Sequence, residues 1–375
     1  MLLHSAPALA ASTRSNRQRR ARSSCSCSSG SAGGDEPAPS SFSEKDLAGL
    51  SARVSQLRAE EVATDMRISG NWRHGRAKTG LSRLPDWARR VALSEQYAVA
   101  GSYGGNVHVL DATSGFPLVR TLSGLSGETT TLSFDGVTVA AGSRTGEVCR
   151  WDVETGAGGL VGRLEGAVSA VALLPGGTVL ACSDGGVVQA FTGGDEPQQP
   201  PLLLGKPVGS LAVSGRYTAV GCGDGTVEIF ASSSPGTPPL QILSFKAHSA
   251  PVLALAILNG SVGDDPSCLF TAGGDGAIRA WSLATGEALL RIEGAHRAAV
   301  TCLAVDHSKV VSGGRDGAVR VWDAVSGARR FTMSPFTAYL DGLAFHNNVL
   351  VTTGVNDAIS VSDFATERPG SRAGE

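Results

Sequence analysis

The sequence predicts an all-β protein built as a seven-bladed β-propeller, in which seven small sheets form a closed ring. Two observations carry this prediction. One segment pattern returns seven times with a spacing near 40 residues, and a fixed period of that length with four short strands per unit is typical of a propeller. The chain also combines 49 glycines with only 18% charged residues, a composition that favours short strands joined by tight turns.

The seven repeated units share one position that is apolar in all but the last of them. The spacings between successive occurrences are 41, 40, 39, 51, 41 and 40 residues. Each unit alternates apolar with polar residues, and a single small sheet of this kind cannot bury both of its faces. Stacking the sheets in a ring buries the faces against one another and leaves only short edges. The residues at the shared position are Leu110, Trp151, Phe191, Phe230, Trp281, Trp322 and Ser362.

Size and composition exclude several classes of protein. The chain has 375 residues, of which 42% are apolar, enough to build a sizeable core, so we do not expect a largely disordered chain. The longest uninterrupted apolar stretch is seven residues long, at 252–258. A membrane-spanning helix needs about 20, so the sequence predicts no integral membrane protein.

The charges and cysteines argue against nucleic-acid, zinc and disulfide chemistry. The first 34 residues hold five arginines and no acid, whereas the rest of the chain is acidic, with 34 Asp and Glu against 27 Lys and Arg. Phosphate contacts require clustered cations, so we expect no nucleic-acid partner. The seven cysteines are dispersed without a C-x-x-C pair, which predicts reduced thiols and neither a disulfide framework nor a metal site.

Residues 1–41 form a leader rich in Ser, Ala, Arg and Gly, in which the first acid is Asp35. This composition is typical of an organellar transit peptide, and its serine content favours the chloroplast. The alternatives are an inert disordered tail, which would leave the protein cytoplasmic, and a secretory signal. The secretory signal fits worst because the positive charge follows the short apolar stretch.

Residues 42–75 are predicted to be a helical lead-in and linker, with the helix at 43–66. Ser43 and Asp46 have the spacing of a capping box, and five apolar residues recur at near-helical spacing to form one stripe. We expect this stripe either to pack on the neighbouring domain or to bind a partner. Its members are Leu47, Leu50, Val54, Leu57 and Val62.

Residues 76–364 resemble the WD40 repeat family. Trp151-Asp152 and Trp322-Asp323 match the dipeptide that names the family, and Ala247-His248 and Ala295-His296 stand where Gly-His is usual. Asp224-Gly225, Asp275-Gly276 and Asp316-Gly317 match its tight turn, and Asp-Gly supplies the positive φ that a two-residue hairpin needs. The resemblance implies radial four-stranded blades around a central channel.

The same resemblance implies a buried hydrogen-bonded tetrad in two units. The fifth unit holds His248, Thr271, Asp275 and Trp281, and the sixth holds His296, Ser312, Asp316 and Trp322. The implied bonds run from Asp to His, from His to the hydroxyl, and from the hydroxyl to the indole. Although His, Ser and Asp also suggest a hydrolase, at this repeat position they imply a structural role. We expect the turns of the other five units to be held by packing alone.

The two ends of the propeller are expected to close the ring together. After Asp363 the charged, proline-containing tail at 365–375 is predicted to be disordered and to supply no outer strand. Residues 77–84 read as a lone strand, which we expect to complete the last blade. The fifth unit is longer than the others, and the excess lies in two turn-rich loops at 232–239 and 259–266.

One face of the ring is predicted to bind a partner protein. The residue just before the Asp position of each turn faces solvent on the top face, and a second top-face position precedes each inner strand. Trp, Tyr and Arg dominate binding hot spots. Residues of these types at the two positions, together with Phe336 at the histidine position of the last unit, form the predicted patch. Alternatively, Trp87 and Phe336 plug gaps beneath their loops. The patch comprises Trp87, Tyr103, Arg144, Arg315, Phe336 and Tyr339.

The sequence therefore predicts a non-catalytic interaction scaffold that binds other proteins and no cofactor or metal. No nucleophile elbow, P-loop, HExxH or paired-carboxylate motif is present, so a propeller enzyme is only a remote alternative. A second alternative is a ubiquitin-ligase substrate receptor. Asn71-Trp72-Arg73 is similar to the junction that precedes the propeller in F-box/WD40 proteins, although no F-box is visible at 43–66.

Overall fold

The computed structural model describes residues 44–192, 200–232, 239–259, 266–334, 339–354 and 357–366. The chain divides into two compact units, Met1–Leu57 and Arg58–Glu375. One helix, α1 (Glu44–His74), crosses the boundary between them, and the second unit contains every strand. The predicted leader at 1–41, the tail from 367 onward and most of the two fifth-unit loops lie outside the described residues.

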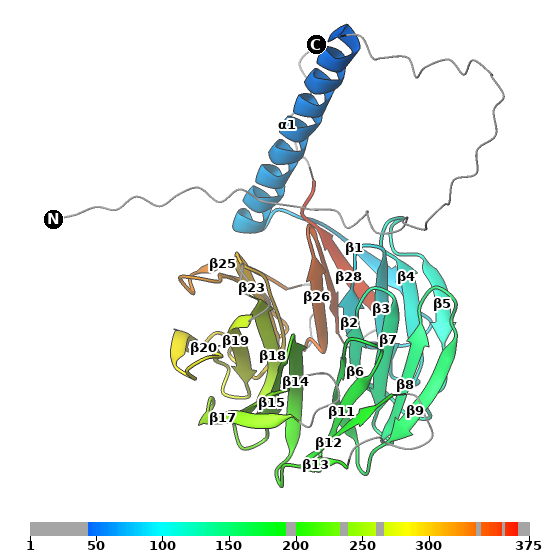
Figure 1. The fold of residues 1–375 in the computed structure, drawn as a ribbon, viewed down its shortest axis with the longest axis vertical. Coiled ribbons are helices and arrows are strands. Elements are labelled where there is room, and N and C mark those ends of the chain that lie inside the picture. Colours follow the sequence, from blue (N-terminus) through cyan, green and yellow to red (C-terminus); the bar gives the residue numbers. More distant parts are fainter. Residues whose placement is uncertain are drawn as a thin grey trace, which may run out of the picture. The chain divides into compact units, whose positions relative to one another are not determined.

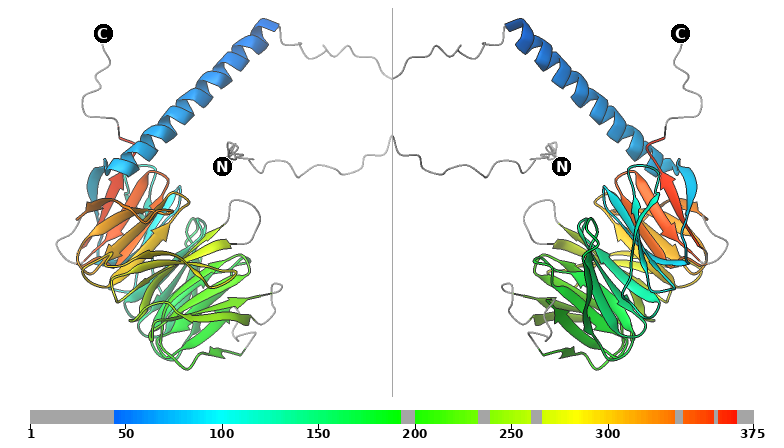
Figure 2. Two further views of the ribbon diagram at one scale, coloured as in Figure 1. Left: turned by 90° about the vertical axis from the view of Figure 1, so that its left-hand side faces the viewer. Right: turned by 90° about the vertical axis from the view of Figure 1, so that its right-hand side faces the viewer.

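The strands form seven four-stranded sheets, which confirms the predicted seven-bladed propeller (Figures 1 and 2). Each inner strand contacts the inner strands of the two neighbouring sheets, so the sheets follow one another around a closed ring. From inner to outer strand, the first three blades are β2 (Ala88–Leu93), β3 (Tyr97–Ser102), β4 (Val107–Asp111), β5 (Leu118–Leu122); β6 (Thr129–Phe134), β7 (Thr138–Ser143), β8 (Glu147–Asp152), β9 (Gly158–Arg163); and β10 (Val168–Leu173), β11 (Val179–Ser183), β12 (Val187–Phe191), β13 (Leu202–Leu203).

Blades four to seven repeat this meander, and only the last takes its outer strand from the other end of the chain. Their strands are β14 (Val208–Ser214), β15 (Tyr217–Cys222), β16 (Thr226–Ala231), β17 (Leu240–Lys246); β18 (Val252–Asn259), β19 (Pro266–Gly273), β20 (Ile278–Ser282), β21 (Ala288–Ile292); β22 (Val300–Val305), β23 (Lys309–Gly314), β24 (Val319–Asp323), β25 (Arg329–Met333); and β26 (Gly342–His346), β27 (Val349–Thr353), β28 (Ala358–Asp363), β1 (Lys78–Arg83).

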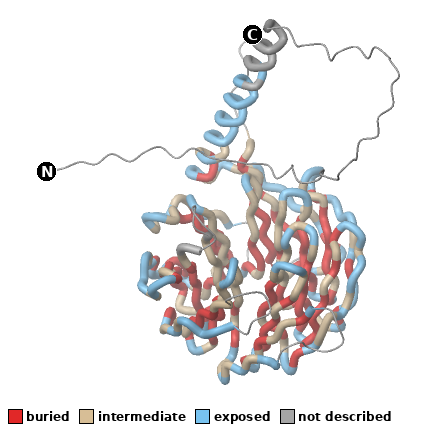
Figure 3. The backbone as a smooth tube through the Cα atoms, in the orientation of Figure 1, coloured by how far each residue is buried: buried red, intermediate tan, exposed pale blue. Residues whose placement is uncertain are grey.

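The core lies between the blades and not within any single sheet. The second strand of a blade is covered on both faces, and every residue of β23 is buried. Outer strands are largely exposed, as in β5 and β21, which places the buried segments toward the centre of the ring (Figure 3). Stacking thus buries sheet faces that one small blade would leave in water.

The predicted ring closure by the N-terminal strand is confirmed. β1 pairs antiparallel with β28, with Lys78 opposite Asp363 and Arg83 opposite Ala358. The Leu84 amide then donates to the carbonyl of Asp357 at 2.7 Å. The last blade therefore forms only when the two ends of the propeller meet.

Two arginines close the same seam at the inner strands. Arg89 Nη1 lies 3.0 Å from the carboxylate of Glu128 in the second blade, and Arg89 Nε lies 3.3 Å from Asp341 in the seventh. Arg90 Nε donates to the Thr130 carbonyl at 2.6 Å, and its Nη1 donates to the Asp341 carbonyl. The first blade is thereby bonded to both of its neighbours.

The end of α1 is anchored on the seventh blade. Trp72 is only 2% exposed, and its indole N–H donates to the carbonyl of Asn347 at 3.1 Å. Asn71 Nδ2 donates to the carbonyls of Phe364 and Thr366 at 2.8 and 3.0 Å. The Asn-Trp-Arg junction therefore works as a bracket between the two chain ends.

The helix differs from the prediction in length and in the face that it buries. It continues to His74, beyond the predicted end near residue 66, because Asn71 and Trp72 are helical while they are anchored. The expectation that the apolar stripe packs on the neighbouring domain is wrong at Val62, which is 56% exposed. Ser43 and the side chains of Leu47, Leu50 and Val54 lie outside what the structure describes.

Candidate functional site

On the top face of the ring, two backbone positions lie next to each other on each of the first six blades. On every one, the residue before the Asp position donates its amide N–H to the carbonyl of the residue that precedes the inner strand. This hydrogen bond holds the two positions next to each other on the top face. The donor-to-acceptor distances are 2.9 Å for Tyr103 to Trp87, 3.1 Å for Arg144 to Glu128, 2.9 Å for Asp184 to Ala167, 2.7 Å for Gly223 to Pro207, 2.8 Å for Gly274 to Pro251 and 2.9 Å for Arg315 to Ala299.

On the first blade the two adjacent side chains are aromatic. Trp87 is 53% exposed and Tyr103 is 58% exposed, and their rings meet edge to face with centroids 6.3 Å apart. The loop beneath them is fixed by Asp86, whose carboxylate accepts the Trp87 amide at 2.7 Å and the Gly104 amide at 2.5 Å. The alternative that Trp87 plugs a gap beneath its loop is wrong, because more than half of its surface faces water.

The second blade adds a charged network next to this aromatic pair. Arg144 contacts the buried carboxylate of Glu128 through Nε, and its own side chain remains 68% exposed. Burial alone would raise the pKa of Glu128, but hydrogen bonds and charges from Arg144 and Arg89 outweigh it and lower that pKa. Arg144 is therefore held in position while the rest of its guanidinium faces water.

The predicted patch spans four consecutive blades. Arg315 is exposed on the sixth blade, and Tyr339 is 43% exposed at the start of the seventh. Trp87 and Tyr103 follow on the first blade and Arg144 on the second, so the described members form an arc. Phe336 lies outside the described residues. The third, fourth and fifth blades instead have alanine, proline, glycine or an acid at the two positions, namely Ala167, Asp184, Pro207, Gly223, Pro251 and Gly274.

The two tetrads lie under the top face of the fifth and sixth blades. In the fifth, His248 Nδ1 is 2.9 Å from Asp275 Oδ1, His248 Nε2 is 2.8 Å from Thr271 Oγ1, and the Trp281 indole donates to Thr271 at 3.0 Å. The sixth blade repeats the chain through other residues. There the same three distances are 2.9, 2.8 and 2.9 Å, between His296 and Asp316, His296 and Ser312, and Trp322 and Ser312.

An arginine from the third strand of the blade joins each tetrad as a fifth member. The tetrad pattern in the sequence did not predict this arginine. Arg279 Nη1 lies 2.9 Å from Asp275, and Arg320 Nη1 lies 2.7 Å from Asp316. Burial alone would raise the pKa of both aspartates. The hydrogen bonds from the arginine and the histidine outweigh burial and hold the pKa of each carboxyl well below its usual range.

The tetrads are built to hold loops and not to attack a substrate. The hydroxyl-bearing residues Thr271 and Ser312 are 0% exposed, so no substrate carbonyl can reach their oxygens. Each hydroxyl already bonds both an imidazole and an indole. Burial lowers the pKa of His248 and His296 despite the adjacent carboxylates, so neutral imidazoles link each turn to its blade.

The expectation that the other blades rely on packing alone is wrong for the first, the second and the fourth. In the first, the Asp86 carboxylate accepts the amide N–H of Gly104 in the turn. In the second, buried Glu147 accepts hydrogen bonds from the amide and hydroxyl of Ser126 at 2.6 and 2.8 Å and pairs with Arg163 at 2.8 Å. In the fourth, Lys206 Nζ lies 2.6 Å from the buried carboxylate of Glu228. Different residue types thus perform the same bracing.

The comparisons with known proteins agree with this architecture. The family model described as WD domain, G-beta repeat matches residues 239–282 and 287–323. These segments run from the outer strand of the fourth blade to the third strand of the sixth and contain both tetrads. No curated protein matches the sequence. Among solved structures, the computationally designed Ika8 protein aligns with a TM-score of 0.56 and 22% identity, over 75% of this chain and 98% of that one. At this identity the likeness concerns the fold alone.

Two other kinds of site are absent from the described ranges. No helix there has the length and apolar character to cross a membrane. No group of three or more His, Cys, Asp or Glu side chains within those ranges could hold a metal ion.

Proposed function

Since this chain carries a WD40 repeat domain that forms a seven-bladed β-propeller, we propose that it is a non-catalytic scaffold that holds a partner protein on its top face. WD40 propellers are typically protein-interaction scaffolds and usually non-catalytic. The proposal places the contact at the arc of Arg315, Tyr339, Trp87, Tyr103 and Arg144, to which the sequence adds Phe336.

The exposed aromatic pair is the single observation that carries the proposal. Trp87 and Tyr103 keep more than half of their surfaces in water, although burial of an aromatic ring is energetically favourable. The carboxylate of Asp86 and the hydrogen bond that the Tyr103 amide donates to the Trp87 carbonyl hold the pair in place. A partner would therefore bury these rings at small conformational cost, since they are already ordered.

The arginines at either end of the arc give the contact its polar component. Arg144 is fixed through Glu128, and the planar guanidinium of an exposed arginine suits carboxylates and carbonyl oxygens of a partner. Proline, glycine and alanine on the opposite half of the top face offer little side-chain surface by comparison. The arc is thus the part of this face best equipped to supply binding energy.

We further propose that the protein acts in an organelle, with the chloroplast first. The support is the composition of residues 1–41, which combines arginine, serine and alanine with an absence of acids before Asp35. Fluorescent fusions with and without residues 1–41 test the address. Plastid fluorescence that is lost on truncation supports it, and diffuse cytosolic fluorescence of both fusions overturns it.

The scaffold proposal is tested by partner capture with a surface variant. The double variant Trp87→Ala and Tyr339→Ala removes two exposed rings of the arc, so it should lose the proteins that the wild-type chain captures while its thermal unfolding stays unchanged. Leu240→Ala is the matched control, because Leu240 is 72% exposed on an outer strand away from the arc. Equal capture by all three proteins would remove the proposal.

The same capture experiment addresses the ubiquitin-ligase alternative. Recovery of cullin adaptors, together with a cytosolic location, would favour a substrate receptor. Nothing in the anchored Asn71 and Trp72 requires an adaptor, because Asn71 bonds the segment after β28 and Trp72 bonds the β26–β27 turn of the seventh blade.

A further inference from the structure

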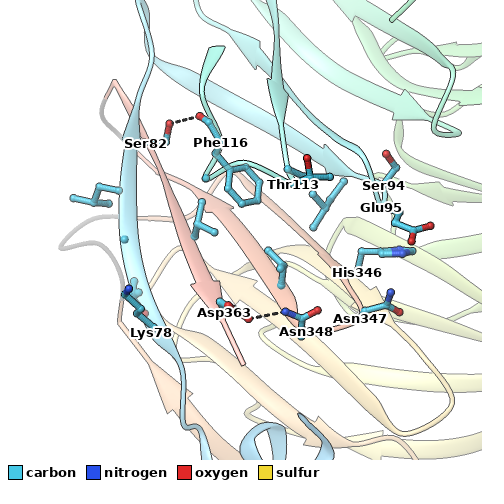
Figure 4. Close-up of a pocket in the computed structure, with 18 residues that line it drawn as sticks. Lys78, Ser82, Ser94, Glu95, Thr113, Phe116, His346, Asn347, Asn348 and Asp363 are labelled. Atoms are coloured by element: carbon cyan, nitrogen blue, oxygen red, sulfur yellow. Dashed lines mark hydrogen bonds between the residues drawn. The ribbon is translucent and has the colours of Figure 1, made fainter. Parts of the chain in front are cut away.

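A second candidate site lies on the opposite face, at the seam where the first and last blades meet (Figure 4). A pocket of about 580 Å³ opens between the closing strand β1, the end of β28 and the hairpins of the first and seventh blades. This volume falls within the range of ligand pockets. Its apolar lining includes Leu93, Phe116, Val349 and Val361.

Two unusual backbone conformations line this one pocket. Phe116 has φ +64° and Asn347 has φ +49°, and within the described ranges no other residue besides glycine has a positive φ. Asparagine adopts this region readily, whereas a bulky residue such as Phe116 is strained there. The Phe116 carbonyl is held by the Ser82 hydroxyl at 2.8 Å, and the Asn347 carbonyl by Trp72 at 3.1 Å. Such strain gathers at binding sites more often than elsewhere.

The polar groups of the pocket have opposite characters at its two ends. At one end Lys78 lies directly across from Asp363 in the β1–β28 ladder, which balances the charge there. At the other end the lining includes Glu95 and His346 (Figure 4), and Lys78 at the opposite end is the one lysine or arginine among the described residues that line the pocket. The Glu95 end therefore carries a negative charge that the pocket itself does not compensate.

We propose that this seam pocket binds an extended peptide of a partner protein in which an aliphatic side chain stands next to a lysine or arginine. The aliphatic group packs on Val349 and Val361, beside the buried ring of Phe116, and the cationic group pairs with Glu95. This contact is separate from the arc on the top face and does not depend on it. Because the pocket bridges the closing strand and the first blade, an occupant also stabilises the ring closure.

The test is an array of hexapeptides probed with the purified full-length chain. The array varies one aliphatic and one charged position, with lysine, arginine, glutamate or glutamine at the charged position. Wild type should retain the lysine and arginine peptides selectively. The strongest of them, measured by fluorescence anisotropy, should bind about tenfold more weakly to Glu95→Gln, since one charge-assisted hydrogen bond is lost.

Glu154→Gln is the matched control, because Glu154 is an exposed acid at a hairpin of the second blade, outside the pocket. It should bind the selected peptide like wild type. Both variants change exposed residues and should unfold at the wild-type temperature. Preference for the glutamate peptides, no selective retention, or equal loss of binding in Glu95→Gln and Glu154→Gln would each overturn the proposal.

Discussion

The indole of Trp72 stacks on the phenyl ring of Phe364, with ring centroids 3.7 Å apart and planes 13° from parallel. Nearly 300 residues separate the two along the chain. Lys309 lies over the same indole at 4.6 Å, so the sixth blade also contacts it. One side chain thus ties the segment before β1 to the segment after β28, at the place where the ring closes.

Replacing Trp72 by alanine should therefore destabilise the whole propeller. The change removes a buried aromatic ring and leaves the Asn347 carbonyl without its donor, which together cost about 3–5 kcal/mol. Urea unfolding measures the loss. Met66→Ala on the same helix is the control, because Met66 is 72% exposed and should change stability by less than about 0.5 kcal/mol. Similar losses for the two variants would contradict the anchoring role.

The Ser312→Ala variant tests the sixth-blade tetrad. It leaves His296 Nε2 and the Trp322 indole N–H buried without their shared partner, and such groups cost about 1–3 kcal/mol. The second blade naturally has Ala141 at the equivalent position, and the Ala141→Ser variant should bring no comparable gain, because no histidine accompanies it. Thermal unfolding of both variants checks the pair of predictions. An unchanged Ser312→Ala protein would show that the tetrad contributes nothing to stability.

Acid should destabilise the fold in two stages. Burial lowers the pKa of His248 and His296, so below about pH 6.5 the unfolded chain binds more protons than the folded one, and stability falls. The pKa of Asp275 and Asp316 is also lowered. Their contribution is present above the ordinary aspartate pKa of about 3.9 and is lost as the pH falls further. Unfolding temperatures from pH 8 to pH 3 measure both stages, and stability that rises below pH 6.5 would contradict the assignment.

Two N-terminal truncations should distinguish the contribution of helix α1 to stability from that of the closing strand β1. A chain that starts at residue 70 keeps Asn71, Trp72 and β1 and should unfold in one cooperative transition. A chain that starts at residue 85 lacks the outer strand of the seventh blade, so β28 has an unpaired edge and the cooperative transition should broaden or vanish. Circular dichroism melting compares them. Cooperative unfolding of the shorter chain at the wild-type temperature would show that closure is dispensable.

The strand architecture could be predicted from sequence because it depends on local patterns. Three of its features can be recognised in the sequence: the period near 40 residues, the Asp-Gly turns and the lone strand before the first unit. The tetrad residues are implied by the resemblance to WD40 repeats. Only the hydroxyl and tryptophan positions keep a constant spacing from the turn aspartate, four residues before it and six after it, because the loop that carries the histidine differs in length between the two units.

The interactions across blades could not be predicted in the same way. Arg89 reads as an ordinary strand residue, and only the closed ring brings it to Glu128 and Asp341. The role of Glu147 in holding its loop could not be predicted from the tetrad pattern, because a glutamate does there what the tetrad does in the fifth and sixth blades. The positive φ of Phe116 could not be predicted either, because no turn motif in the sequence indicates it. The one sequence feature that could have indicated the contacts across blades was the pair Arg89-Arg90, near the start of an otherwise apolar strand.

The central claim is that a preformed arc of aromatic and arginine side chains on the top face grips a protein. Its most direct test is the dissociation constant of the captured partner for wild type, Trp87→Ala and Leu240→Ala, measured by titration calorimetry. A hot-spot aromatic contributes about 2 kcal/mol or more, so Trp87→Ala should weaken binding about 30-fold or more, while Leu240→Ala should leave it unchanged. Equal dissociation constants for the three proteins would contradict the claim.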